Sequence, residues 1–229
     1  MALSGITVAD VVGTWAGLRP LVKSATSGRT ADLSRRHKVH QSPSGMVTIT
    51  GGKLTTYREM SADTVDEVVS GLGDAVKKSA RLSRTKKLRL RGAEGYEAAR
   101  IAGDERSVHL ADRYGGEARN VLAFIDTDPA LGEPLVDGLP YLKAEAVYAA
   151  RHEMARSVDD VLSRRTRARI LARDASGTAA AEVARLIAPI LGLTEQDQTD
   201  QVTAYRAALD EERHAAHLPE TALDASIGA

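Results

Sequence analysis

The chain has 229 residues, of which 43% are hydrophobic and 27% charged, and its 31 basic side chains balance 31 acidic ones. These values are typical of a globular protein with one large or two small domains, and the neutral net charge disfavours nucleic acid as a partner. The absence of cysteine excludes disulfides, thiolate metal sites and cysteine nucleophiles. Since only 3% of the residues are aromatic, we expect a core of small aliphatic side chains in close-packed helices.

No apolar run is long enough to cross a bilayer, and the first residues lack the basic-then-apolar order of a signal peptide. We therefore expect a cytoplasmic protein. The alternative is a protein that binds peripherally at the inner face of the plasma membrane.

The first fifty residues favour short strands. Thr7 and Asp10 have the spacing of a helix start and predict a single short turn. Three strand-like runs follow at residues 17–22, 37–40 and 46–50, separated by stretches rich in Ser, Thr and Gly.

Helical spacing of apolar residues begins at Leu54 and continues to Leu72. Gly51 and Gly52 stand between the third predicted strand and this helix. The sequence therefore predicts a strand, a glycine turn and a helix N-terminus in direct succession.

Residues 77–91 carry eight Lys and Arg and no acidic residue, which is typical of an exposed connector. Beyond it, apolar periodicity and start signals predict helices at 96–102, 105–114, 117–125, 142–154, from 157, from 178 to about 192, and from 194, with residues 202, 205 and 209 inward. The predicted fold class is α+β, with a strand-and-helix domain at 1–76, a basic linker at 77–92, a helical bundle at 93–215 and a disordered tail at 216–229.

The glycine junction is the most informative motif. Two glycines allow close approach to the backbone, and the free N–H groups of the next helix favour an anionic ligand edge. The alternative is a plain turn in which glycine serves geometry and Lys53 serves solubility, and spacing alone favours this alternative. A Walker loop is excluded because Met46 stands where that motif requires glycine.

Arg19 lies within an apolar run and needs an anionic partner, either a structural carboxylate or a ligand phosphate or carboxylate. Arg35 and Arg36 could converge on the same place or form a solvated strand edge. The six histidines show no metal-ligand spacing, so no metal site is predicted. For residues 163–167, we expect a helix end with ion pairs to Asp159 and Asp160.

Taken together, residues 16–21, 34–36 and 51–58 (GGKLTTYR) resemble the C-terminal half of the FAD-dependent, quinone-linked glycerol-3-phosphate dehydrogenases. Residues 148–155 (YAARHEMA) and 160–167 (DVLSRRTR) resemble the helical C-terminal domain of that family. The resemblance implies the end of a flavin- and substrate-binding domain followed by an all-α domain. It also implies oxidation of sn-glycerol 3-phosphate to dihydroxyacetone phosphate, with electrons passing through FAD to quinone.

The resemblance assigns roles to individual residues. Arg19 and Arg35 would bind the substrate phosphate, with Arg36 as the alternative to Arg35, and Lys53 would lie near the substrate oxygens or the flavin edge. Backbone groups of Gly51, Gly52, Lys53, Leu54 and Thr55 would bind the flavin. The catalytic base is not assigned.

The family's Gly-x-Gly-x-x-Gly turn for the FAD pyrophosphate does not occur in this sequence. We therefore expect a C-terminal fragment or one piece of a split enzyme, inactive alone, with a companion flavin-binding chain or a homodimer as its assembly. The rival interpretation is a non-catalytic helical interaction module, or a membrane-surface module in which residues 77–91 contact acidic lipids or a partner protein. A third is a related enzyme that oxidises amino acids, with Arg19 holding the carboxylate.

Overall fold

The structure, a computed structural model, describes residues 5, 7–11, 14–18, 37–101 and 103–217. The chain divides into two compact units. We call Ala16–Leu90 the hairpin unit, and Met1–Trp15 together with Arg91–Ala229 the helical unit. The boundary between residues 90 and 91 falls near the end of the predicted basic linker, and the first fifteen residues belong to the unit that contains the helices. The domain bounds given above remain predictions.

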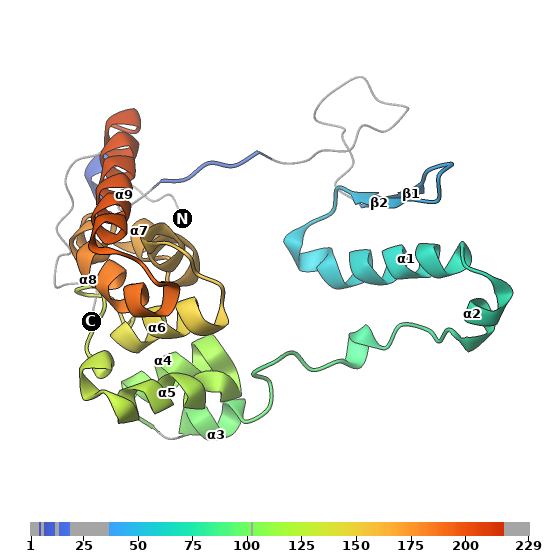
Figure 1. The fold of residues 1–229 in the computed structure, drawn as a ribbon, viewed down its shortest axis with the longest axis horizontal. Coiled ribbons are helices and arrows are strands. Elements are labelled where there is room, and N and C mark those ends of the chain that lie inside the picture. The colour runs from blue at the N-terminus through green and yellow to red at the C-terminus, as the bar shows by residue number, and fades with distance from the viewer. Residues whose placement is uncertain (1–4, 6, 12–13, 19–36, 102, 218–229) are drawn as a thin grey trace. The chain divides into compact units, whose positions relative to one another are not determined.

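The hairpin unit contains two antiparallel strands, β1 (Lys38–Gln41) and β2 (Val47–Thr50), with Lys38 opposite Thr50 and Gln41 opposite Val47 (Figure 1). Gly45 in the connecting turn has a φ of 87°, a conformation that glycine adopts readily. Two of the three predicted strands are thus confirmed. Most of the first, residues 19–22, lies outside the described residues.

A helical segment follows the hairpin, as predicted. It begins with the 3₁₀ turn η3 (Leu54–Thr56), continues as α1 (Tyr57–Ser70) and ends at Gly71. The basic region then contains α2 (Asp74–Ser79), which includes Lys77 and Lys78, and the short turn η4 (Thr85–Lys87).

One face of α1 packs on the hairpin and another is open. Met60 contacts Gly52 and His37 pairs with Asp63, so these positions face the strands. The predicted apolar face lies elsewhere on the helix: Leu54 is 89% exposed and Val65 58% exposed, and Tyr57, Val68 and Leu72 are exposed as well. No described residue between 37 and 90 is fully buried. The hairpin unit therefore presents an apolar stripe to solvent.

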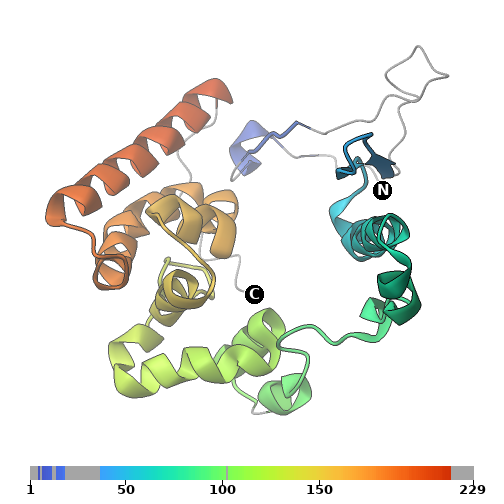
Figure 2. The same ribbon diagram turned by 45° about the vertical axis from the view of Figure 1, so that its right-hand side comes forward.

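The helical unit is a bundle, as predicted. Its elements are η1 (Val8–Asp10), α3 (Tyr96–Ile101), α4 (Glu105–Tyr114), η5 (Gly115–Glu117), α5 (Ala118–Thr127), η6 (Pro129–Gly132), α6 (Lys143–His152), the π-helix η7 (Asp160–Arg165), α7 (Ala168–Leu171), α8 (Arg173–Leu191) and α9 (Glu195–Ala215). Figure 2 shows α3, α4 and α5 at one end of this unit and α9 at the other.

Small aliphatic residues fill the core. Helix α6 runs through it, with Ala144, Ala146 and Ala149 fully buried, and packs against α5 and α8. Tyr205 and Leu209 of α9 point inward, as their spacing predicts, and seal the far side of α8. Because alanine side chains are short, the helices approach closely with few aromatic rings between them.

The start of α8 and the C-terminal tail are the next two predicted features. Helix α8 begins at Arg173, five residues before the predicted start at Thr178. Its first turn buries the polar residues Arg173 and Ser176, so apolar periodicity does not reveal it. Of the predicted tail, residues 218–229 lie outside the described residues. Within the described part of the chain, no helix is long and apolar enough to span a bilayer.

Candidate functional site

The turn between β2 and η3 carries the candidate site. Gly51 and Gly52 have positive φ angles of 76° and 80°. Glycine adopts this conformation without the steric cost that other residues meet. The predicted succession of strand, glycine turn and helix start is therefore confirmed.

Gly52 is also a point of close packing. A methyl group there would overlap the sulfur of Met60 and lie 3.3 Å from Cβ of His37. The chain's own side chains thus fill the space beside Gly52. Glycine at this position allows the turn to pack closely on Met60 of α1.

The residues after the glycines form an open helix start. Lys53, Leu54 and Thr55 are all exposed. The N–H of Lys53 donates to Oγ1 of Thr56 at 3.1 Å, and the Thr56 hydroxyl donates back to the Lys53 carbonyl at 3.0 Å. The N–H groups of Leu54 and Thr55 have no acceptor within their own helix. With Lys53 as the N-cap, this turn suits a group that carries or develops negative charge.

The predicted anion pocket depends on arginine side chains that approach Lys53. Arg19, Arg35 and Arg36 lie outside the described residues, so their approach to Lys53 stays a prediction. The adjacent His37 is described, and its Nε2 lies 2.6 Å from Oδ2 of Asp63 on α1. Sequence spacing gives no sign of this pair, because the two residues are 26 positions apart.

A buried carboxylate organises the helical unit. Glu145, fully buried in the first turn of α6, accepts hydrogen bonds from the Leu142 N–H at 2.7 Å and the Tyr114 hydroxyl at 3.0 Å. His109 Nε2 and Arg113 Nε also lie 2.9 Å from its oxygens. Burial, followed by the Glu145 charge, raises the pKa of the Tyr114 hydroxyl. The cluster holds α4 to α6, and nothing in the sequence pattern predicts it.

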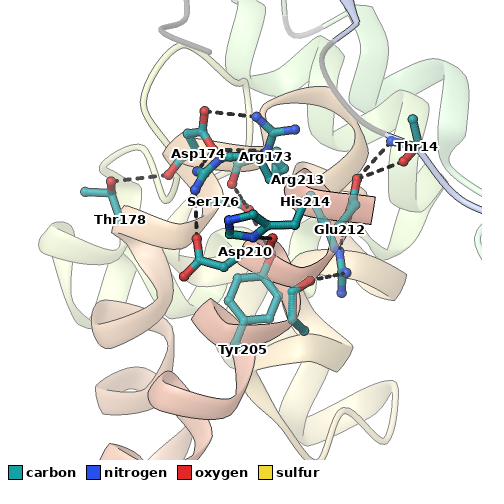
Figure 3. Close-up of polar contacts among 12 residues, drawn as sticks. Thr14, Arg173, Asp174, Ser176, Thr178, Tyr205, Asp210, Glu212, Arg213 and His214 are labelled. Atoms are coloured by element: carbon teal, nitrogen blue, oxygen red, sulfur yellow. Dashed lines mark hydrogen bonds and ion pairs between the residues drawn. The ribbon is translucent and has the colours of Figure 1, made fainter. Parts of the chain in front are cut away.

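A second polar cluster lies between the start of α8 and the end of α9 (Figure 3). Asp174 receives ion pairs from the buried Arg173, at 3.1 Å, and from Arg213 of α9, at 2.7 Å. The Ser176 and Tyr205 hydroxyls are 2.8 Å apart, and burial raises the pKa of Tyr205 to about 12. These contacts join the two helices.

The basic stretch 163–167 is structural, as predicted. Arg164 Nη1 lies 2.6 Å from Asp159 and 3.0 Å from Asp160. Arg165 donates from Nε and Nη2 to the Glu153 carbonyl, at 3.0 and 2.6 Å, just beyond the end of α6. In the described ranges no group of three or more His, Asp or Glu could hold a metal ion.

Three curated proteins show the extent of the relationship. The chain is 40% identical over 217 residues to "Glycerol-3-phosphate dehydrogenase 2" of Mycobacterium tuberculosis (strain ATCC 25618 / H37Rv), a match that covers 90% of this chain and 36% of that protein. "Glycerol-3-phosphate dehydrogenase" of Mycobacterium leprae (strain TN) is 39% identical with the same coverage. The mitochondrial glycerol-3-phosphate dehydrogenase SDP6 of Arabidopsis thaliana is 35% identical, over 78% of this chain and 31% of its own length. The chain thus spans about a third of the length of the curated relatives it matches.

A solved structure supports the same relationship to glycerol-3-phosphate dehydrogenases. The glycerol-3-phosphate dehydrogenase of Bacillus halodurans, complexed with FAD, superimposes with a TM-score of 0.65 and 25% sequence identity, over 91% of this chain and 41% of that one. The family described as the C-terminal domain of alpha-glycerophosphate oxidase matches residues 83–198. The chain therefore belongs to the FAD-dependent glycerol-3-phosphate dehydrogenase family, and its residues 83–198 match the C-terminal domain of alpha-glycerophosphate oxidase.

Proposed function

We propose that this chain contributes the C-terminal part of an enzyme that oxidises sn-glycerol 3-phosphate to dihydroxyacetone phosphate. The observation that carries the proposal is the 40% identity to a glycerol-3-phosphate dehydrogenase over 90% of the chain. A match of this extent covers both units, so the hairpin unit and the helical unit are proposed to act in one enzyme.

FAD is the proposed cofactor, and the glycine junction fits part of it. The N–H groups of Leu54 and Thr55, both exposed residues, would face the flavin edge on which negative charge accumulates, while Gly51 and Gly52 set the turn that presents them. Bound FAD would supply the acceptor for the hydride that leaves carbon 2 of the substrate. Lys53, at the N-cap, would favour the oxyanion form of the substrate or of the flavin edge.

Arg19 and Arg35 are proposed to hold the substrate phosphate, with Arg36 as the alternative to Arg35. Guanidinium groups bind phosphate through two parallel hydrogen bonds, and two of them would balance its charge and orient the substrate. The proposed electron acceptor is a quinone.

The exposed apolar stripe that runs from η3 along α1 to Leu72 supports the proposal that the chain is inactive alone. Leu54, Tyr57, Val65, Val68 and Leu72 leave apolar area in water, which costs free energy unless a partner covers it. We propose that the flavin-binding part of the enzyme covers this stripe, whether it belongs to the same polypeptide or to a companion chain. A homodimer stays a further prediction.

A second candidate function is peripheral membrane contact. Residues 77–91 carry eight cationic side chains and no acidic one, and Leu82, Leu88 and Leu90 within them are at least 66% exposed. Basic side chains attract anionic lipids, and exposed leucines gain from entering the interface. We propose that this segment holds the enzyme at the cytoplasmic face of the plasma membrane.

A chimera tests the dehydrogenase proposal. It would join the flavin-binding part of the M. tuberculosis relative to this chain, in place of the matched 36% of that protein. We expect a yellow protein that reduces a phenazine dye only when sn-glycerol 3-phosphate is added. The separate 229-residue chain should be colourless and inactive.

Two variants of the chimera sharpen the test. Lys53→Met should lower kcat by about a hundredfold or more, since it removes a charge proposed to act on the developing oxyanion. Lys38→Met, in the exposed β1 strand, is the matched control and should retain full turnover. A flavin-loaded chimera with no response to glycerol 3-phosphate, or with equal kcat in both variants, would contradict the proposal.

A further inference from the structure

The helical unit contains an open apolar cavity of about 530 Å³ between α5, η6, α6 and α8. This volume lies in the range of small-molecule sites, roughly 300–1,000 Å³. Its walls are mainly apolar: Phe124, Leu131, Val147, Leu186, Pro189 and Ile190. Val147 and Leu186 are buried, whereas Pro189 is exposed, so the cavity leads from the core to the surface.

Four polar residues complete the lining: Thr127, Asp128, Arg151 and Arg185. Three of them make contacts within the chain, and Thr127 does so by donating its hydroxyl to the Ala123 carbonyl at 2.9 Å. Arg185 forms a two-point ion pair with Glu182, both distances being 2.8 Å, and Asp128 accepts a hydrogen bond from the Ala130 N–H at 3.1 Å as the cap of η6. Their charges are oriented by these contacts.

Arg151 differs from its neighbours. Its guanidinium lies over the Phe124 ring, 5.3 Å from the ring centre, and no ion pair to it is found in the described part of the chain. A guanidinium on an aromatic face keeps its N–H donors free at the ring's edge. The cavity thus combines an apolar interior with a cation that can accept an anion.

We propose that this cavity binds a single-chain anionic amphiphile, with the hydrocarbon chain against the apolar wall and the head group on Arg151. A carboxylate or a phosphate monoester would satisfy the guanidinium through two hydrogen bonds. Arg151 is exposed, so a neutral molecule would gain nothing from its charge, and a free inorganic anion would leave the wall in water. The inference goes beyond the dehydrogenase function and does not depend on it.

Calorimetric titration of the full chain tests the proposal with four probes: decanoate, decyl phosphate, decanol and inorganic phosphate, the amphiphiles being kept below their micelle-forming concentrations. We expect saturable one-to-one binding of at least one of the two anions that carry a chain. The affinity for decanol should be lower by at least about tenfold, because the charge-assisted hydrogen bonds are lost. The ratio of decanoate to decyl phosphate affinity identifies the head group.

Two variants and one control complete the experiment. Arg151→Gln should weaken binding of the anionic probe about tenfold and leave decanol unchanged. Ala123→Trp, at an exposed position of the lining, should block all chain-bearing probes. Arg119→Gln, on α5 and 76% exposed at its side chain, should change nothing.

Three results would overturn the proposal. The first is the absence of saturable binding of either anionic amphiphile. The second is an equal affinity of Arg151→Gln and Arg119→Gln for the anionic probe. The third is binding of inorganic phosphate as tight as that of decyl phosphate. Circular dichroism of each variant separates loss of binding from loss of fold. Because the readout is binding to this chain, the result is independent of dehydrogenase activity.

Discussion

Nε2 of His109 on α4 lies 2.9 Å from Oε2 of Glu145 on α6, although the two residues are 36 positions apart. The same carboxylate accepts hydrogen bonds from the Leu142 N–H and the Tyr114 hydroxyl, one on each oxygen, and forms an ion pair with Arg113. A fully buried carboxylate is tolerated only with such partners. The cluster therefore fixes the position of α4 against the start of α6.

Glu145→Ala should destabilise the helical unit by about 3 kcal/mol, because it leaves Arg113 without its counter-ion and the Leu142 N–H without its acceptor. The measurement is urea unfolding followed by circular dichroism. Glu211→Gln, exposed on α9, is the matched control and should unfold with the wild type. Equal midpoints for the two variants would show that the cluster contributes nothing to stability.

Gly116→Ala tests a close backbone crossing. The Gly116 N–H donates to the Gly92 carbonyl at 2.7 Å, and a methyl group at Gly116 would overlap the carbonyl oxygen of Glu94. Since backbone has to move, we expect a loss of about 3 kcal/mol in thermal or urea unfolding. Gly192→Ala has open space around it but a φ of 70°, so it should cost only about 1 kcal/mol. The reverse order would contradict this account.

Local sequence patterns predicted the helices and strands whose formation depends on residues that are close in the sequence. The hairpin at 38–50, the glycine turn and α4 at Glu105–Tyr114 all follow from turn residues and apolar spacing. The start of α8 does not, because Arg173 and Ser176 are held inside by ion pairs and hydrogen bonds rather than by apolar contact. Periodicity detects burial only where the buried side chain is apolar.

The candidate site was predictable only in part. The glycine pair signals a turn, and the positive φ angles explain why glycine stands there. The contact of Gly52 with Met60 and the pairing of His37 with Asp63 depend on how α1 packs on the hairpin. Sequence spacing cannot give such contacts, since they join residues that tertiary packing brings together.

Glu182 makes part of the stability dependent on pH. Hydrogen bonds from Arg185 and then from Lys143 lower the pKa of this carboxyl from 4.5 to about 2. A lowered pKa in the folded state stabilises the protein above the ordinary pKa, and this stabilisation is lost as the pH falls from 4.5 toward 2.

Wild type should therefore be more stable than Glu182→Gln at pH 6, and the difference in Tm should shrink as the pH approaches 2. Because the carboxylate is partly exposed, the difference should also be smaller in 1 M salt, roughly ten times a usual assay concentration. Thermal unfolding of both proteins across pH 2–6 measures it. A constant difference at every pH would mean that the charge of Glu182 contributes nothing.

The basic segment should bind anionic vesicles through charge first and leucine insertion second. Replacing Lys77, Lys78, Arg81 and Arg84 by Gln removes four of the eight cations, each worth about 1 kcal/mol near an anionic surface. The affinity for vesicles containing phosphatidylserine, measured by co-sedimentation, should fall at least a hundredfold, and 0.5 M salt should have a similar effect on the wild type.

Leu82→Ser with Leu88→Ser should weaken vesicle binding less and leave its salt dependence intact, because those side chains carry no charge. Binding to neutral vesicles as tight as to anionic ones would contradict an electrostatic attachment, whereas loss of binding in the leucine variant alone would make insertion the dominant contribution.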